Sequence, residues 1–141
     1  TVITPVGGGG LAAGMCLAVA ARGANVRVLG AEPSGADDAA RSLAKGERLP
    51  QLDPRTVADG LRTGLGAMTF PILAEHMRAI LTADDEGIVR AMRLLCERAK
   101  LVVEPSGAVG LAAVLAHPEA CGEHVGLVLT GGNVDLGALP W

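Results

Sequence analysis

The sequence predicts an α/β fold in which a parallel sheet is sandwiched between helices. Short β-branched, apolar runs alternate with Ala- and Leu-rich runs of helical length, and a run of four glycines joins the first strand to the first helix. Such alternation is typical of parallel sheets covered on both faces. The chain has 141 residues, with no internal repeat or linker, so we expect residues 1–141 to form one unit.

The first half of the chain predicts a βαβ unit, a further helix and a long irregular segment. Strands are expected over residues 1–6 and 25–31, with a helix over 11–23 between them. A right-handed unit of this kind places the glycine run at the carboxyl edge of the sheet, where α/β proteins bind ligands. A helix is expected over 36–46, and Pro and Gly residues indicate irregular backbone over 49–66.

The second half of the chain predicts three helices and two strands. A short helix from Pro71 to near Arg78 precedes a strand over 79–82, and Thr82-Ala-Asp-Asp matches the capping box that starts a helix. A second apolar helix is expected from Pro105 through Leu115, and a final buried strand over 124–130. This strand leads into a second glycine turn.

Composition excludes several classes of function. Net charge is −3 without a basic run, and one Trp, one Phe and no Tyr leave little for nucleic-acid bases to stack on. The longest apolar stretch, Leu11–Ala21, is about half of a membrane span. Three widely spaced cysteines favour a reducing, cytoplasmic setting. A first residue that is not Met, inside an expected strand, suggests a fragment of a longer chain.

The strongest local signal is VGGGGLAAG, between a strand and a helix. Consecutive glycines let backbone amides approach an anion closely, and the helix N-terminus adds a partial positive charge. A phosphate is therefore the expected ligand. The alternative is a tight turn that packs helix against strand and binds nothing.

A dinucleotide site is a second functional hypothesis for the same residues. Gly8-x-Gly10-x-x-Ala13 satisfies the dinucleotide fingerprint, and Glu32 follows at the distance of a ribose-binding carboxylate. Two features argue against it, because Pro33 follows the Glu directly and the second glycine turn, after Thr130, has no role in such a site.

Five motifs in register identify a resemblance. The runs TPVGGGGLAAG, AEPSGADDA, VADGL, ERAKLVVEPSGAVGLAAVLA and VLTGGNVDL closely resemble the serine racemase and threonine dehydratase family of fold-type-II, tryptophan-synthase-β-like pyridoxal-phosphate enzymes. The resemblance implies that residues 1–141 are the C-terminal part of the cofactor-binding large domain. It also implies that an N-terminal segment and the small domain lie outside this sequence.

The resemblance assigns the cofactor contacts. Backbone amides would hold the cofactor phosphate, Thr130 would hydrogen-bond the pyridine nitrogen, and two further residues would line the pocket. The Glu among these has an alternative role in capping a helix. The cofactor-binding residues implied are Gly7, Gly8, Gly9, Gly10, Leu11, Gly60, Glu104 and Thr130.

The resemblance also implies a divalent-cation site. Carboxylates of Glu32 and Asp38 and the carbonyl of Ala36 form an oxygen set that suits Mg²⁺, with Ca²⁺ or Mn²⁺ as substitutes. Such a metal would be structural or activating. The alternative is that Asp37 and Asp38 only cap a helix and Glu32 lies near water.

The reaction that the resemblance implies acts on serine or threonine. Loss of the α-proton is followed by β-elimination of the hydroxyl, giving a 2-oxo acid and ammonia, or by racemisation. No catalytic residue is expected here, because the lysine that carries the cofactor lies upstream in the family and neither Lys45 nor Lys100 matches its motif. The parent is expected to be a homodimer, and the alternative is a stand-alone phosphate- or dinucleotide-binding module of Rossmann type.

Overall fold

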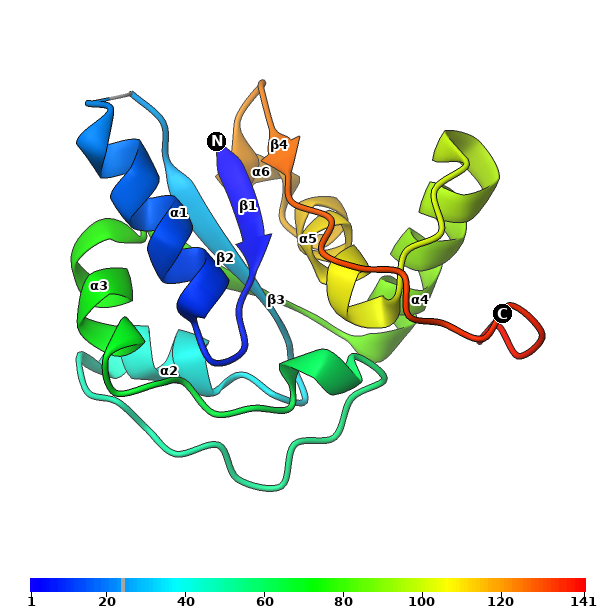
Figure 1. Ribbon diagram of the computed structural model, residues 1–141, viewed down its shortest axis with the longest axis horizontal. Coiled ribbons are helices and arrows are strands. Elements are labelled where there is room, and N and C mark those ends of the chain that lie inside the picture. The colour runs from blue at the N-terminus through cyan, green and yellow to red at the C-terminus, as the bar shows by residue number, and fades with distance from the viewer. Residues whose placement is uncertain (24) are drawn as a thin grey trace.

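The parallel sheet is confirmed by a computed structural model that describes residues 1–23 and 25–141. Four strands lie in the order β3-β2-β1-β4, and every neighbouring pair is parallel (Figure 1). The strands are β1 (Val2–Pro5), β2 (Val28–Pro33), β3 (Ala79–Ala83) and β4 (Gly126–Leu127). Because β1 and β4 are neighbours, both glycine turns leave the sheet at the same edge.

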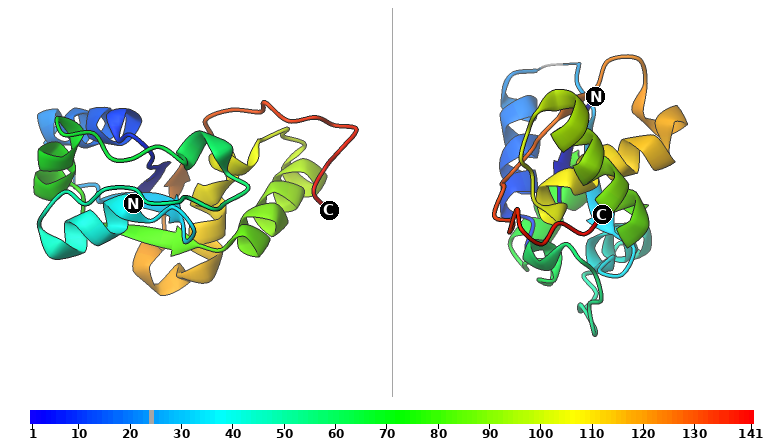
Figure 2. Two further views of the ribbon diagram at one scale, coloured as in Figure 1. Left: turned by 90° about the horizontal axis from the view of Figure 1, so that it is seen from below. Right: turned by 90° about the vertical axis from the view of Figure 1, so that its right-hand side faces the viewer.

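Helices cover both faces of this sheet, as Figure 2 shows. On one face, strand residues such as Val6 and Val28 pack against three helices, and on the other, Ile3 and Leu29 pack against two more. Alternate strand residues point to opposite faces, which produces the two apolar clusters. The first three helices are α1 (Gly10–Ala21), α2 (Asp38–Lys45) and α3 (Thr69–His76), and the other two are α4 (Asp85–Leu94) and α5 (Pro105–Ala116).

Short helical turns connect these elements. A 3₁₀ turn, η1 (Asp59–Leu61), interrupts the segment predicted to be irregular. The last turn after α4, η2 (Leu95–Ala99), is π-helical and ends at Lys100, whose φ is 60°. A single-turn helix, α6 (Pro118–Cys121), links α5 to β4.

Three element boundaries differ from the prediction. Strand β2 runs from Val28 to Pro33, so Glu32 lies inside the strand rather than beyond it. The residue that caps α4 is Asp84, whose Oδ1 accepts the Gly87 amide at 2.7 Å, because β3 continues through Ala83 and leaves Thr82 in the strand. Among the described residues, the last strand pairs with β1 alone, over Gly126–Leu127. The prediction that it is buried is wrong, because Gly126 is exposed and Leu127 half-buried in a strand at the edge of this sheet.

Close packing at β2 gives a direct test of this core. A Cβ at Gly30 would lie 2.8–2.9 Å from atoms of Val6, Met77 and Ile80. Gly30→Ala should therefore lower the free energy of unfolding by about 1–3 kcal/mol, measured by urea denaturation. Gly14→Ala is the control, because a Cβ there meets nothing within 4 Å and alanine favours the helix by up to about 1 kcal/mol. Equal stabilities for the two variants would contradict the packing at β2.

Candidate functional site

One cleft brings together all of the residues that the sequence assigns to the cofactor. It lies at the carboxyl end of β1, beside the turn that follows β4, and has a volume of about 260 Å³. Three lining residues were not predicted: Pro5, Leu61 and Ser106. The rest are Gly7, Gly8, Gly9, Gly10, Leu11, Gly60, Glu104 and Thr130.

Contacts with a neighbouring segment set the orientation of the glycine loop. The Gly8 carbonyl accepts the Gly66 amide at 3.1 Å and lies 2.8 Å from the Thr69 hydroxyl. Gly9 has a φ of 85°, the left-handed conformation that glycine adopts without strain. Between the described residues, no hydrogen bond is donated by the amides of residues 7–12. The loop thus offers amides and a helix N-terminus to an anion, as the sequence predicts.

Glu104 connects the second glycine turn to α5. Its amide donates to the Gly131 carbonyl at 3.0 Å, and its own carbonyl accepts the amides of Gly107 and Ala108. Glu104 is the N-cap residue of α5, and its side chain makes no capping hydrogen bond with the described residues. A Cβ at Gly131 would overlap Glu104 Oε1, so a side chain there would displace the Glu104 carboxylate from its present position. Glu104 is left with its side chain at the cleft.

Of the three lining residues that were not predicted, Ser106 is the one with a polar side chain. It is 5% exposed, and its hydroxyl oxygen accepts the amide of Gly60 at 3.0 Å. This bond joins η1 to the first turn of α5, so two walls of the cleft are connected. Its position directly after Glu104-Pro105 could have indicated a place in the cleft, but the same run is equally typical of an ordinary helix start.

Glu32 and Asp38 are both fully buried, at 0% exposure. Glu32 accepts the α2 amides of Ala39 at 3.3 Å and Ala40 at 2.8 Å, while burial, with a contribution from Asp38, raises its pKa to about 8. Asp38 accepts Gln51 Nε2 at 2.9 Å and the Leu65 amide at 2.7 Å, and burial raises its pKa too.

These contacts overturn the simple capping alternative for the acidic run. Glu32 does not lie near water, and Asp38 anchors the 49–66 segment instead of capping α2. Asp37 pairs with Arg41 at 2.7 Å and makes no capping bond. Within the ranges that the structure describes, no group of three or more His, Cys, Asp or Glu side chains is arranged to hold a metal. The third expected ligand, the Ala36 carbonyl, is a main-chain group.

Burial of Glu32 also contradicts the dinucleotide hypothesis. A ribose-binding carboxylate must be accessible at the end of its strand. Here the carboxylate is inside β2 and already binds two amides of α2. Thr130, which leads into the second glycine turn and has no role in a dinucleotide site, lines the same cleft as the glycine loop.

The two lysines lie away from this cleft. Lys45 pairs with Glu47 at 3.3 Å, and Lys100 Nζ donates to the Glu97 carbonyl at 2.7 Å. Neither lines the cleft.

The three cysteines are free, and Cys16 and Cys121 are buried. In the described part of the chain, no helix has the length and apolar character that a membrane crossing needs.

A site of this kind, with two glycine turns meeting at one edge of a parallel sheet, places the protein in a known class. The chain belongs to the pyridoxal-phosphate dependent enzyme family, whose profile matches residues 1–131. Its fold is that of the fold-type-II members.

Several individual members are similar to this chain. The β-hydroxyaspartate dehydratase of Paracoccus denitrificans (strain Pd 1222) is 46% identical in an alignment of 141 positions that covers 99% of this chain and 45% of the relative. The serine racemase of Oryza sativa subsp. indica is 44% identical, over 99% and 43% of the two chains. The solved threonine deaminase of T.th. is 52% identical with a TM-score of 0.92, over 96% of this chain and 44% of that one. The chain thus spans less than half the length of these relatives.

The left-handed turn at Gly9 gives a prediction for stability. A Cβ there would meet Thr69 Oγ1 at 2.7 Å and Leu65 Cδ1 at 2.8 Å, in addition to the strain of a positive φ. Gly9→Ala should cost about 2 kcal/mol or more of unfolding free energy. Gly10→Ala, where a Cβ meets nothing within 4 Å, should change it by roughly 0.5 kcal/mol or less. Denaturant titrations followed by circular dichroism compare the two, and a Gly10 variant as unstable as the Gly9 variant would refute this account.

Proposed function

We propose that this chain is the cofactor-phosphate-binding part of a pyridoxal-phosphate enzyme acting on serine, threonine or a related hydroxy amino acid. The parent reaction would remove the α-proton and then either eliminate the β-hydroxyl, giving a 2-oxo acid and ammonia, or racemise the substrate. The observation that carries this proposal is a cleft lined both by Thr130 and by the glycine loop, whose amides donate no hydrogen bond to any described residue. Similarity to a β-hydroxyaspartate dehydratase and to serine racemases supports the choice of substrate class.

Each part of the cleft has a proposed task. Amides of Gly7 to Leu11 would hold the phosphate, and the Thr130 hydroxyl would hydrogen-bond the ring nitrogen, while Gly60 and Glu104 would flank the ring. When bound, the cofactor withdraws electrons from the α-carbon of an amino acid. A neutral hydroxyl partner does not hold the ring nitrogen protonated, so this withdrawal is moderated. Moderate withdrawal suits β-elimination and racemisation better than transamination.

The lysine and the surface that binds the substrate carboxylate would come from outside these 141 residues. Neither lysine of the chain lines the cleft, and the curated relatives are more than twice as long. We therefore propose that residues 1–141 are the C-terminal part of the large domain in a parent that forms a homodimer. Three free cysteines support a reducing, cytoplasmic location.

Titration of the purified chain with pyridoxal phosphate, followed by visible absorbance, tests this function. Binding should be weak, should be abolished by inorganic phosphate, and should exceed that of pyridoxal by roughly tenfold or more, because charge-assisted hydrogen bonds to the phosphate would be lost. Thr130→Val should weaken binding of pyridoxal phosphate by roughly fivefold through loss of one hydrogen bond, with little effect on inorganic phosphate.

Borohydride reduction and peptide mapping supply the opposing outcome. Stoichiometric modification of Lys45 or Lys100, with binding that resists phosphate, would mean that the chain carries its own catalytic lysine. Equal binding of pyridoxal and pyridoxal phosphate would remove the assignment of the glycine loop to the phosphate.

We further propose that Glu32, Asp38 and the Ala36 carbonyl hold Mg²⁺, with Ca²⁺ or Mn²⁺ as substitutes. Both carboxylates are fully buried and form no salt bridge in the portion described. Ala36 is 1% exposed, and its carbonyl accepts no hydrogen bond from the described residues. Together with the Ala36 carbonyl, the two buried carboxyl groups form a hard-oxygen set, and a divalent cation would favour their ionised forms, which burial disfavours. The metal would stabilise the turn between β2 and α2.

Thermal melts with and without metal test this site. Mg²⁺ at about ten times its Kd should raise the Tm by roughly 5 °C. Asp38→Asn should remove the shift, whereas Asp37→Asn, the neighbouring carboxylate paired with Arg41, should retain it. The melt of each variant without metal separates loss of the site from loss of the fold. If the Asp38 variant does not fold, Mn²⁺ binding to the unaltered chain, followed by electron paramagnetic resonance, decides the question, and absence of binding would overturn the proposal.

A further inference from the structure

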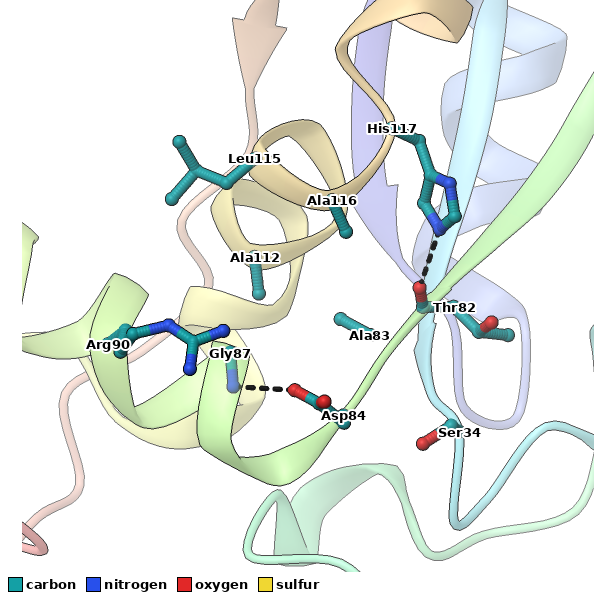
Figure 3. A pocket seen from close by; sticks show the side chains of 10 residues that line it. All are labelled: Ser34, Thr82, Ala83, Asp84, Gly87, Arg90, Ala112, Leu115, Ala116 and His117. Carbon is teal, nitrogen blue, oxygen red and sulfur yellow. Dashed lines mark hydrogen bonds between the residues drawn. The ribbon is translucent and has the colours of Figure 1, made fainter.

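A second cleft, of about 480 Å³, lies between β3, the first turns of α4 and the end of α5. Figure 3 shows its lining side chains. It shares no lining residue with the cleft of the glycine loop, and the proposed function does not use it. Its volume falls within the range of small-molecule sites in proteins, roughly 300–1,000 Å³.

An acid and a base face this cleft on either side of a glycine. Asp84 Oδ1 accepts the Gly87 amide at 2.7 Å, and Arg90 Nη1 donates to Glu86 at 2.6 Å. A Cβ at Gly87 would lie 2.9 Å from Asp84 Oδ1 and 3.6 Å from Arg90 Nη2. Asp84 and Arg90 form no salt bridge with each other. The missing side chain at Gly87 therefore leaves a gap about one side-chain position wide between opposite charges (Figure 3).

Each of these charged groups keeps unused hydrogen-bonding capacity. Only one oxygen of Asp84 caps the helix, and Nη2 of Arg90 has no partner among the described residues. The pair of Arg90 with Glu86 is solvent-exposed, with side chains 61% and 82% accessible, and pairs of this kind contribute little. Arg90 is thus free to bind a second anion without breaking a strong interaction.

The remaining walls are apolar, with hydroxyl groups at one side. Small side chains of Ala83, Ala112 and Ala116 line the cleft on one side of the gap, and Leu115, 53% exposed, lies at its edge (Figure 3). The Ser34 hydroxyl, near Asp84, has no hydrogen-bond partner in the part of the chain described. A ligand therefore meets opposite charges at one end and an alkyl surface at the other.

A hydrogen bond within the protein holds these walls in place. The His117 ring Nε2 lies 3.0 Å from the Thr82 carbonyl, which ties the end of α5 to β3. The cleft is consequently present without a ligand, so little ordering cost is expected on binding.

We propose that this cleft binds a free α-amino acid with an apolar side chain. The ammonium group would lie at Asp84, the carboxylate at Arg90 Nη2, and the alkyl group against Ala112, Ala116 and Leu115. In an α-amino acid the ammonium and carboxylate groups are attached to one carbon, which matches a gap of one side-chain position. A simple carboxylate would leave Asp84 unpaired, and a simple amine would leave Arg90 Nη2 unpaired. This proposal does not depend on pyridoxal phosphate.

Titration of the ¹⁵N-labelled chain with L-leucine, followed by NMR, tests the proposal. Amide shifts should change over residues 82–90 and 112–117 and saturate, while those of residues 7–11 and 130 stay constant in the presence of inorganic phosphate. N-acetyl-leucine, which lacks the ammonium, and leucinamide, which lacks the carboxylate, should each bind roughly tenfold more weakly.

Variants on α4 supply matched controls. Gly87→Ala fills the gap and should reduce leucine affinity roughly tenfold or more. Its Cβ would also lie 2.9 Å from Asp84 Oδ1, which caps the helix, so a urea denaturation of the variant checks that it remains folded. Arg90→Gln should have a similar effect. Arg93→Gln removes the next arginine of the same helix, which pairs with Glu97, and should leave binding unchanged.

Three results would overturn this inference. They are the absence of saturable shifts around the second cleft, equal affinity for leucine and its two blocked analogues, and unchanged binding by the Gly87 variant. Shifts confined to residues 7–11 and 130 would instead assign amino-acid binding to the first cleft, which bears on the proposed function and not on this one.

Discussion

The orientation of one carbonyl group determines what the first cleft offers to a ligand. The Gly8 carbonyl is turned toward Gly66 and Thr69, and Gly9 reverses the chain into α1. Since a peptide group points its carbonyl and amide in opposite directions, this contact leaves the Gly9 amide directed away from the 66–69 segment. The long segment that precedes α3 is therefore part of the site, although it carries only Gly60 and Leu61 into the cleft.

A second buried constraint positions that same segment. Asp38, at the start of α2, accepts hydrogen bonds from Gln51 and Leu65, and Glu32 binds the amides of the first turn of α2. The acidic turn after β2 thus holds the backbone that in turn holds Gly8. Hydrogen bonds through the 49–66 segment therefore connect the residues assigned to the metal with the glycine loop assigned to the cofactor.

Much of this architecture could be predicted from the sequence, because strand and helix runs are short, apolar and separated by glycine. The grouping of the cofactor residues was also predicted, since both glycine turns follow parallel strands. Ser106 and the true cap Asp84 were missed, because polar residues at helix starts look alike until their partners are known. The burial of Glu32 depends on the extension of β2 to Pro33, and strand ends are set by pairing with β1 and β3 rather than by local residues.

The walls of the first cleft are mostly main chain, with Glu104, Ser106 and Thr130 as the polar side chains among them. A binding surface built from peptide groups tolerates substitution at its neighbours, provided that the glycines keep their shape. In such a protein, substitutions at a few side chains can change which reaction is preferred, while the main-chain groups of the cleft stay the same. This separation offers a physical reason why dehydratases and racemases share one scaffold.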